Sequence, residues 1–243
     1  MLIHDMEPPF IAKLQSAGPL PSADKTLLLD LFKNTVSLRP RRDLVREGEK
    51  PDRVHLMIEG WACRYKLLSD GSRQITAFLI PGDFCDTHIT IFDEMDHSIS
   101  SLTDCKVAEV SREAMAELTD RPAIARALWW ASLVDEATLR AWIVNMGRRE
   151  ALVRIAHVIC ELHARLRNVG LGSEEAFELP LTQEELADAL GLTAVHINRT
   201  LKELRVQQVM SFKRQNIIIE DMAALRRMAD FDPNYLHLPR VHR

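Results

Sequence analysis

The sequence predicts an α+β chain made of an N-terminal, jelly-roll-like β-roll, one long central helix and a C-terminal winged helix-turn-helix. Three observations lead to this fold class. Short β-like runs fill the first half, an apolar helical period follows from residue 122, and two capped helices flank a glycine near the C-terminus. A chain of 243 residues exceeds the usual size of one domain. We expect the β-roll at 1–120, the central helix at 121–147 and the C-terminal domain at 148–243.

Composition indicates an ordinary globular protein, with 47% hydrophobic and 27% charged residues. The first ten residues contain Asp5 and Glu7, and they lack the basic start and apolar run of a signal peptide. The apolar stretch 129–144 is interrupted by three charged residues, so it does not fit a membrane-spanning helix. We therefore expect a cytoplasmic protein with no membrane partner.

The cysteines are widely separated and form no C-x-x-C pair, which favours buried free thiols over a zinc site or a disulfide framework. They are Cys63, Cys85, Cys105 and Cys160. We predict no metal site.

The first half of the chain reads as a small all-β unit. Turn signals such as Gly60, Asp70-Gly71 and Pro81-Gly82 separate the β-like runs, and their spacing suits a barrel or jelly roll. The runs are Arg53–Ile58, Trp61–Leu67, Gln74–Ile80 and Cys105–Val110.

The region from Pro122 to Met146 carries two apolar stripes when it is drawn as a helix at 100° per residue. The first stripe is Ile124, Leu128, Ala131, Leu139, Trp142 and Met146; the second is Trp130, Leu133, Val134, Ala137, Ala141 and Val144. A surface helix needs one stripe, so a second stripe favours contact with a twin helix in a homodimer. We place the dimer contact on the first stripe, although the pattern does not decide between the two. The alternative is a helix buried on all sides in one domain.

A further helix begins after Arg148 and ends near Gly170-Leu171-Gly172, and two short helices follow it. Thr182 and Glu185 form a capping box at the first of them. Gly191 suits the left-handed residue that ends this helix, and Thr193 can cap the next one. So short a connection predicts a helix-turn-helix over Leu181–Gln207.

The second helix of the pair should bury Ile197, Leu201 and Leu204, which leaves a polar and small-residue face for the major groove of DNA. Arg199 can span guanine O6 and N7, Asn198 can read adenine, and Ala194 or Val195 can meet a thymine methyl. Phosphate contacts are expected from threonine and lysine. The predicted DNA-binding residues are Thr182, Thr193, Ala194, Val195, His196, Asn198, Arg199, Lys202, Lys213 and Arg214. The alternative is a helical hairpin with a solvated charged face.

The segments from Val206 to Met210 and from Asn216 to Glu220 read as a β-hairpin after the second helix, with Lys213 and Arg214 at its tip. Such a wing can follow a phosphate strand. The chain has a net charge of −4, but Thr193–Arg214 holds five basic residues against one acidic residue. Basic charge thus collects where DNA binding is predicted.

With these motifs the sequence resembles the Crp/Fnr family of bacterial transcription regulators over nearly its whole length. Gly82-Asp83-Phe84 resembles the Gly-Glu turn of the family's ligand cassette, and 181–204 resembles its helix-turn-helix. The resemblance implies a β-roll sensor, a dimer helix and a winged helix that binds a pseudo-palindromic promoter site. We expect double-stranded DNA, a second copy of the chain and RNA polymerase as partners. On the recognition helix only Arg199 keeps the family's residue type, so the target sequence stays open.

The sensor departs further from the family pattern. Cyclic-nucleotide binders hold phosphate with an Arg-Ser or Arg-Thr pair, and this chain has His97-Ser98 after Asp96. Loss of the arginine removes the strongest phosphate contact. Cyclic-nucleotide control is kept as an alternative to an unidentified signal or constitutive activity. We place the effector pocket at Asp83, Cys85, His97 and Ser98.

We predict no cofactor. The N-terminal cysteine cluster of the family's iron–sulfur sensor is absent. Cys85 and His88 lie near the haem ligands of a carbon monoxide-sensing relative, but at a different spacing, and we interpret them as core residues.

We predict no enzyme activity. Catalysis would recruit Cys85 with His88 or His55, and no phosphate loop, metal motif or carboxylate pair accompanies them. A further alternative is a ligand-sensing module that acts through protein partners without binding DNA.

Overall fold

The computed structural model describes residues 7–87 and 91–239. The chain divides into two compact units, one of Met1–Lys66 with Phe78–Leu133 and one of Leu67–Ala77 with Val134–Arg243. This division falls within the central helix, α4 (Pro122–Arg148), which ends two residues after Met146, where the predicted apolar pattern stops.

The first unit opens with two helices that the hydrophobic pattern did not reveal, α1 (Pro9–Gln15) and α2 (Ser22–Asp30), and with a short 3-10 helix, η1 (Leu31–Lys33). Each α-helix starts directly after a proline, Pro8 or Pro21. The fixed φ of proline is compatible with the start of a helix, where its missing N–H costs no helical bond. The helices are short, so their apolar period covers too few turns to stand out.

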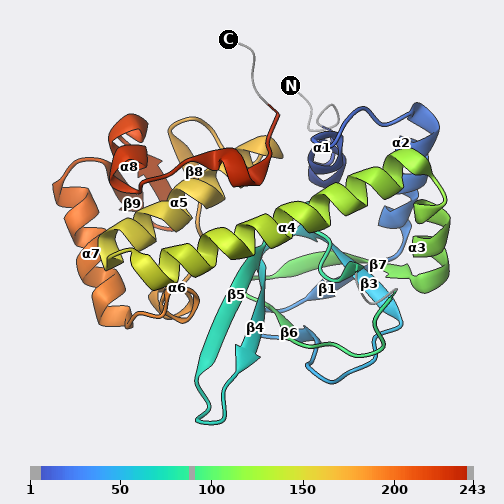
Figure 1. Ribbon diagram of the computed structural model, residues 1–243, viewed down its shortest axis with the longest axis horizontal. Coiled ribbons are helices and arrows are strands. Elements are labelled where there is room, and N and C mark those ends of the chain that lie inside the picture. Colours follow the sequence, from blue (N-terminus) through green and yellow to red (C-terminus); the bar gives the residue numbers. More distant parts are fainter. Residues whose placement is uncertain (1–6, 88–90, 240–243) are drawn as a thin grey trace. The chain divides into compact units, whose positions relative to one another are not determined.

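The strands of the β-roll form two antiparallel sheets, with orders β1-β7-β3 and β2-β6-β4-β5 (Figure 1). Their bounds are Thr35–Leu38 (β1), Asp43–Val45 (β2), Arg53–Glu59 (β3), Ala62–Leu67 (β4), Arg73–Leu79 (β5), Ser98–Ser101 (β6) and Cys105–Ser111 (β7), and α3 (Arg112–Thr119) follows. All four predicted β-like runs are strands. The shorter strands β1, β2 and β6 add pairing that short sequence windows do not reveal.

The turn between β3 and β4 requires glycine. Gly60 has a φ of +82°, and a Cβ there would lie 2.2 Å from the carbonyl oxygen of Asp104. A side chain would therefore clash with backbone as well as adopt a strained φ. This close approach joins the β3–β4 turn to the start of β7.

The core of the first unit joins both sheets to the start of α4. Phe10 and Leu14 of α1 pack in one buried cluster with strand residues, and Ile124 and Leu128 belong to the same cluster. This burial excludes water from the inner faces of the roll and contributes most of its stability. The first two turns of α4 are thus part of the first unit's core.

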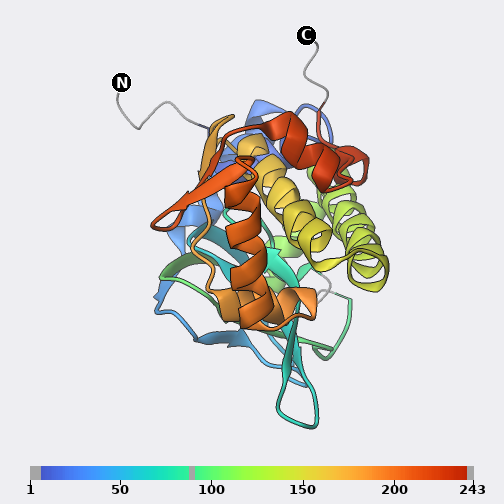
Figure 2. The ribbon, with the colours of Figure 1, turned by 90° about the vertical axis from the view of Figure 1, so that its left-hand side faces the viewer.

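The second unit is a winged helix-turn-helix (Figure 2). Its elements are α5 (Ala151–Asn168), β8 (Ala176–Glu178), α6 (Gln183–Leu190), α7 (Ala194–Val206), β9 (Met210–Lys213), β10 (Asn216–Ile219), α8 (Met222–Met228) and the 3-10 helix η3 (Pro233–Leu236). The wing is a three-stranded antiparallel sheet of order β8-β10-β9. Its strand β9 begins at Met210 and not at Val206, because α7 continues through Val206 and takes that part of the predicted strand.

The four cysteines lie within the described residues, are buried and form no disulfide. Cys63, Cys85 and Cys105 lie in the first unit, and Cys160 lies in α5 of the second. Burial raises the pKa of Cys160 to about 12 and raises the pKa of Cys85 well above its usual value. These thiols behave as core side chains at neutral pH, as the sequence predicts.

Candidate nucleic-acid interface

The capped turn between α6 and α7 has the geometry that the sequence predicts. The Thr182 hydroxyl accepts a hydrogen bond from the Glu185 backbone N–H at 3.1 Å, and Glu185 Oε2 accepts one from the Thr182 N–H at 2.7 Å. Gly191 ends α6 in the left-handed region, with a φ of +61°. Thr193 Oγ1 then accepts the His196 N–H at 3.2 Å and starts α7. Both ends of the turn are fixed by local hydrogen bonds, which sets the direction of α7.

The inner side of α7 packs on the rest of the second unit through Ile197 and Leu204, which are fully buried. Thr200 is also buried, whereas Leu201 is only half-buried and lines a groove beside the helix. The prediction that Leu201 faces fully inward is therefore wrong, and the residue before it, Thr200, is the buried one. Thr200 and Leu201 lie on opposite sides of the direction shared by the two buried anchors, at about the same angle from it, and the domain covers Thr200 more completely.

The outer side of α7 carries the predicted base-reading residues. Val195 is 80% exposed, an unusual environment for a large apolar side chain on a helix of a folded domain. Arg199 and Lys202 are exposed as well, and Asn198 is half-buried. These side chains span one face of the helix, as their spacing requires.

A groove of about 330 Å³ runs beside this face, between α7, the start of α6 and the wing. Four predicted DNA-binding residues line it together: Thr182, Asn198, Lys202 and Arg214. The remaining six, Thr193, Ala194, Val195, His196, Arg199 and Lys213, lie on the first turns of α7 or on the wing and do not line the groove. Arg205 also lines it and extends the basic lining.

The wing places cationic side chains at its tip. Lys213 pairs with Asn216 across the hairpin, so Arg214 and Gln215 form a two-residue turn. Arg214 has a φ of +60°, a region that non-glycine residues rarely adopt. Lys213 and Arg214 are both exposed.

Gln183, which sequence reasoning missed, lies in the same groove as the predicted DNA-binding residues. It is the first residue of α6, and its Oε1 accepts a hydrogen bond from Asn198 Nδ2 at 3.2 Å. Its position directly after the capping threonine is the one signal in the sequence that could have placed it near α7.

Comparison with known proteins gives matches to both units. A Crp-like helix-turn-helix domain matches residues 153–228, and a cyclic nucleotide-binding domain matches residues 35–121. The nitrogen fixation regulation protein FixK of Azorhizobium caulinodans is 26% identical over 188 residues, or 76% of this chain and 75% of the relative. The transcriptional activator protein FnrL of Cereibacter sphaeroides is 26% identical over 215 residues, or 86% of each chain. The structure of FixK2 from Bradyrhizobium japonicum matches with a TM-score of 0.73 at 26% identity, covering 80% of this chain and 96% of that one.

The chain belongs to the Crp/Fnr family. As a Crp/Fnr protein with this helix-turn-helix, it is a DNA-binding transcription regulator. Both of these relatives are named as regulatory proteins. None of the helices described is both long and apolar enough to span a lipid bilayer.

The predicted effector residues of the Crp/Fnr β-roll make internal contacts. The Asp83 carboxylate accepts from Lys13 Nζ at 2.6 Å and from the Ile80 N–H at 2.9 Å, which ties α1 to the turn after β5. The Ser98 hydroxyl accepts the Glu47 N–H at 3.0 Å. Both groups thus serve the packing of the roll.

The other two predicted effector residues lie beside a buried carboxylate and a guanidinium that sequence reasoning missed. His97 Nε2 is 3.3 Å from Asp86 Oδ1, and Asp86 is buried. The Arg64 guanidinium donates to the carbonyl oxygen of Cys85 at 2.8 and 3.0 Å. His88 lies outside the described residues. Within the described ranges, no three His, Cys, Asp or Glu side chains gather as a metal site would require.

Helix α4 buries much of the stripe on which the dimer contact was placed. Ile124 and Leu128 pack in the core of the first unit, and Trp142 is 2% exposed in the second. These three residues pack inside the chain and expose little surface to a second copy. Both apolar stripes of α4 have partners within the chain over part of their length, which helical periodicity alone does not reveal. The exposed large apolar residues of α4 are Trp129, Leu133, Leu139, Ile143 and Val144.

A buried polar cluster joins the end of α4 to α5 and η3 in the second unit. Trp142 Nε1 and the Tyr235 hydroxyl each donate to Glu161 Oε2 at 2.9 Å, and Arg165 lies 3.4 Å from Oε1. Glu161 is fully buried, and desolvation raises its pKa above the usual value despite these donors. A buried carboxylate without hydrogen-bond donors would cost much free energy. Trp142, Tyr235 and Arg165 must therefore stay close to Glu161, and this requirement holds α4, α5 and η3 together.

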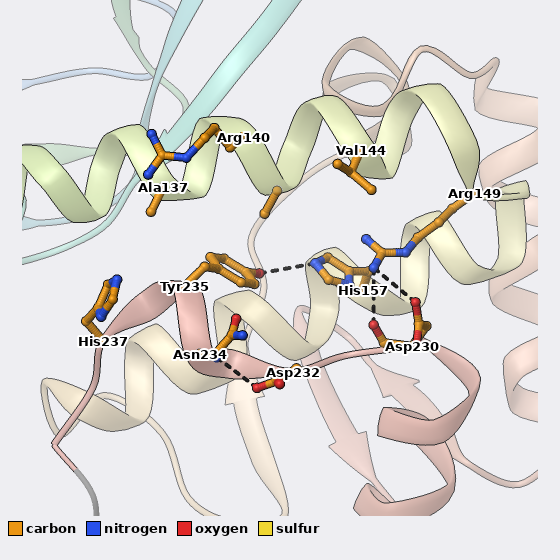
Figure 3. A pocket seen from close by; sticks show the side chains of 11 residues that line it. Ala137, Arg140, Val144, Arg149, His157, Asp230, Asp232, Asn234, Tyr235 and His237 are labelled. Atoms are coloured by element: carbon orange, nitrogen blue, oxygen red, sulfur yellow. Dashed lines mark hydrogen bonds and ion pairs between the residues drawn. The ribbon is translucent and has the colours of Figure 1, made fainter.

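His157 lies at the edge of this cluster. Its ring stacks on Tyr235, with Nε2 3.2 Å from the tyrosine hydroxyl, and its Nδ1 is 3.3 Å from the carbonyl oxygen of Ala229 (Figure 3). An open groove of about 600 Å³ beside it is lined by Ala137 and Val144 of α4, by Arg149, and by Tyr235. Arg149 donates to Asp230 at 3.2 Å and so secures the segment that leads into η3.

Replacement of Tyr235 by phenylalanine is expected to destabilise the second unit by ~1–3 kcal/mol, because Glu161 loses one of its donors while staying buried. The free energy of unfolding from a urea titration measures this. Tyr65→Phe is the matched control, since the Tyr65 hydroxyl donates to Asp43, whose side chain is 26% exposed and can be solvated instead. Equal losses in the two variants would contradict a special role for the cluster.

Acid is expected to destabilise the protein. Burial lowers the pKa of His55 and His163, and lowers that of His157 to about 4. Below the ordinary histidine pKa of ~6.5 the unfolded chain takes up protons that the folded chain refuses. The free energy of unfolding therefore falls as the pH drops from ~6.5 to ~4, with His157 contributing at most ~3 kcal/mol.

The raised pKa of Glu161 acts in the opposite direction, because the folded chain binds that proton more readily than the unfolded chain. The measurement therefore compares how steeply the free energy of unfolding depends on pH in the original chain and in a histidine variant. Urea unfolding at several pH values between 7 and 4.5 should give a weaker dependence for His157→Gln than for the original chain. An unchanged slope would mean that His157 is not responsible.

Proposed function

We propose that this Crp/Fnr regulator acts as a homodimer on a pseudo-palindromic promoter site, with the paired central helices as its dimer contact. The proposed domains are the β-roll at 1–120, the central helix at 121–147 and the DNA-binding domain at 148–243. A regulator of this kind works on the chromosome and with RNA polymerase, which gives it a cytoplasmic location.

One observation on α4 carries the dimer. Positions 129, 133, 136, 140, 143 and 147 follow one another at alternating spacings of four and three, and we call this set the α4 seam. This spacing is that of a two-stranded coiled coil. Trp129 is 69% and Ile143 is 67% exposed, and Leu133 is also exposed. Apolar side chains in a coiled-coil pattern on a surface favour a helical partner with the same pattern.

The middle of the α4 seam is charged. Glu136 and Arg140 form an ion pair along the helix, and both side chains are largely exposed. Polar layers within an apolar seam set register and partner choice in coiled coils. In a homodimer with parallel α4 helices, the Glu136–Arg140 pairs of the two protomers would face each other across the two-fold axis. Leu139 and Val144 flank the seam and would pack across it, since residues in their positions contact each other between the helices.

The two recognition helices of such a dimer would enter successive major grooves, with half-sites about one helical turn apart. Arg199 would read guanine, and Val195 would contact a thymine methyl. The hydroxyls of Thr182 and Thr193 accept the cap hydrogen bonds, so their protons are left to donate to phosphate. Lys202, Lys213 and Arg214 would supply the sequence-independent electrostatic contribution.

We propose that the effector of the β-roll is not a cyclic nucleotide. His97 and Ser98 take the place of the family's phosphate-binding pair, and their surroundings disfavour an anion. His97 lies between the carboxylates of Asp86 and Asp96, whose negative charges would repel a phosphate. Titration calorimetry with cyclic AMP and cyclic GMP tests this, and micromolar binding of either would refute it. The signal is then another ligand, or the regulator is constitutively active.

Selection of bound DNA from a random pool, with the full-length chain, tests the proposed function as a whole. We expect an enriched sequence with two-fold symmetry and half-site centres ~10–11 base pairs apart. Light scattering on the same sample should give twice the chain mass of 27.7 kDa. A symmetric sequence with a monomeric protein would remove the dimer alone. No enriched sequence would favour the alternative that the chain acts through protein partners without binding DNA.

A further inference from the structure

We propose that Gln183 is a positioning residue for DNA recognition, which orients the Asn198 amide so that it reads adenine and rejects guanine. The proposal goes beyond the proposed function by assigning a base preference to a contact between α6 and α7. It rests on the sequence-specific DNA binding proposed above.

The observation is the hydrogen bond between the two amides. Asn198 lies on the outer face of α7, one residue before Arg199, and its Nδ2 donates to Gln183 Oε1 at 3.2 Å. Gln183 is the first residue of α6, whose start is fixed by the Thr182 and Glu185 capping box. The glutamine backbone is therefore anchored independently of DNA. Both side chains line the groove beside the recognition helix.

This hydrogen bond decides which atoms of Asn198 remain for a base. An asparagine amide has two N–H donors and one acceptor oxygen. One donor is used by Gln183, so one N–H and the Oδ1 are left, side by side. Adenine presents an acceptor, N7, next to a donor, the N6 amino group, in the major groove. The remaining donor and acceptor of Asn198 match that pair.

Guanine presents two acceptors, N7 and O6, at the same edge. With the amide held by Gln183, Oδ1 would face O6 and two acceptors would repel each other. Without Gln183 the amide is free to turn and to direct both Nδ2 hydrogens at N7 and O6. The acceptor on Gln183 thus excludes guanine and leaves adenine as the preferred base.

Gln183 has a second group available. Its Oε1 is used by Asn198, and its Nε2 is left with two donors at the start of a helix, where backbone N–H groups and the helix dipole favour an anion. A phosphate of the bound strand would suit this end of the side chain. Gln183 would then contact a phosphate of the DNA backbone through its Nε2 and hold the base-reading Asn198 through its Oε1.

Parallel selections from a random DNA pool test the proposal with full-length protein. Asn198→Ala identifies the position in the half-site that Asn198 reads, because only that position should lose its adenine preference, of roughly 10-fold or more. Gln183→Ala should lower the ratio of adenine to guanine at this position to ~3-fold or less, by admitting guanine, and should leave the position read by Arg199 unchanged.

Gln183→Glu is the matched control. A carboxylate keeps the acceptor for Asn198 Nδ2, so the adenine preference should persist, while repulsion of phosphate lowers affinity for every sequence. A purely structural role of Gln183 would weaken binding to adenine and guanine sites equally, and that result would overturn the proposal. So would an Asn198→Ala selection that matches the original. Failure of the original chain to enrich any sequence would instead refute sequence-specific binding itself.

Discussion

Ile143→Glu is expected to convert the dimer into monomers and to abolish tight DNA binding. Ile143 is 67% exposed on the α4 seam, and a two-fold axis would bring two such side chains together. The variant removes two apolar contacts of ~1.5–3 kcal/mol each, which together weaken dimerisation by about 10²–10⁴-fold. Repulsion between the two new carboxylates adds to this loss.

DNA affinity should fall with the dimer, because a monomer binds one half-site without the effective concentration that linkage provides. Light scattering across a dilution series and a DNA-binding titration measure the two effects. Ile91→Glu is the matched control, since Ile91 is 82% exposed and is not part of the α4 seam. An Ile143→Glu protein that stays dimeric at micromolar concentration would place the dimer contact elsewhere.

Arg199→Ala is expected to lower the affinity for the selected DNA site by at least ~30-fold. A guanine contact made by arginine with two hydrogen bonds contributes ~1–3 kcal/mol, and a symmetric site contains two of them. The total of ~2–6 kcal/mol exceeds what any single phosphate contact on α7 should provide. Affinity for unrelated DNA should change far less, since that binding is mainly electrostatic.

Two controls separate base reading from charge. Arg199→Lys keeps the positive charge but loses the planar fork of donors, so it should resemble Arg199→Ala on the selected site and the original chain on unrelated DNA. Lys202→Ala should weaken binding to all sequences and reduce the salt dependence of binding by about one counterion per protomer. If Arg199→Lys retained full affinity for the selected site, Arg199 would be a phosphate contact.

The winged helix-turn-helix could be predicted closely from the sequence because its determinants are local. The cap hydrogen bonds of Thr182 and Thr193 and the positive φ of Gly191 each depend on residues within a few positions. The outward direction of Val195 and Arg199 follows from helical period alone. Gln183 was missed because its partner, Asn198, lies on another helix.

The burial of the central helix could not be predicted in the same way. Periodicity revealed that α4 is apolar on two sides, but not which apolar residues the chain itself would cover. Trp142 is buried because Glu161 and Tyr235, from α5 and η3, meet it in space. Glu161 is a charged residue within α5, and nothing near it in sequence indicates that it is fully buried. Such long-range polar contacts depend on tertiary structure.

The distribution of the cysteines has a practical consequence. A maleimide can reach a buried thiol only after the surrounding structure opens, so the rate of labelling reports that opening. Three of the thiols belong to one unit and Cys160 belongs to the other, so the opening of each unit can be followed by the labelling rate of its own thiols. Mass spectrometry of labelled peptides could then measure the labelling rates of both units in a single sample, without any engineered probe. Slower labelling of Cys160 alone when operator DNA is added would show that the duplex tightens only the part of the molecule that holds it.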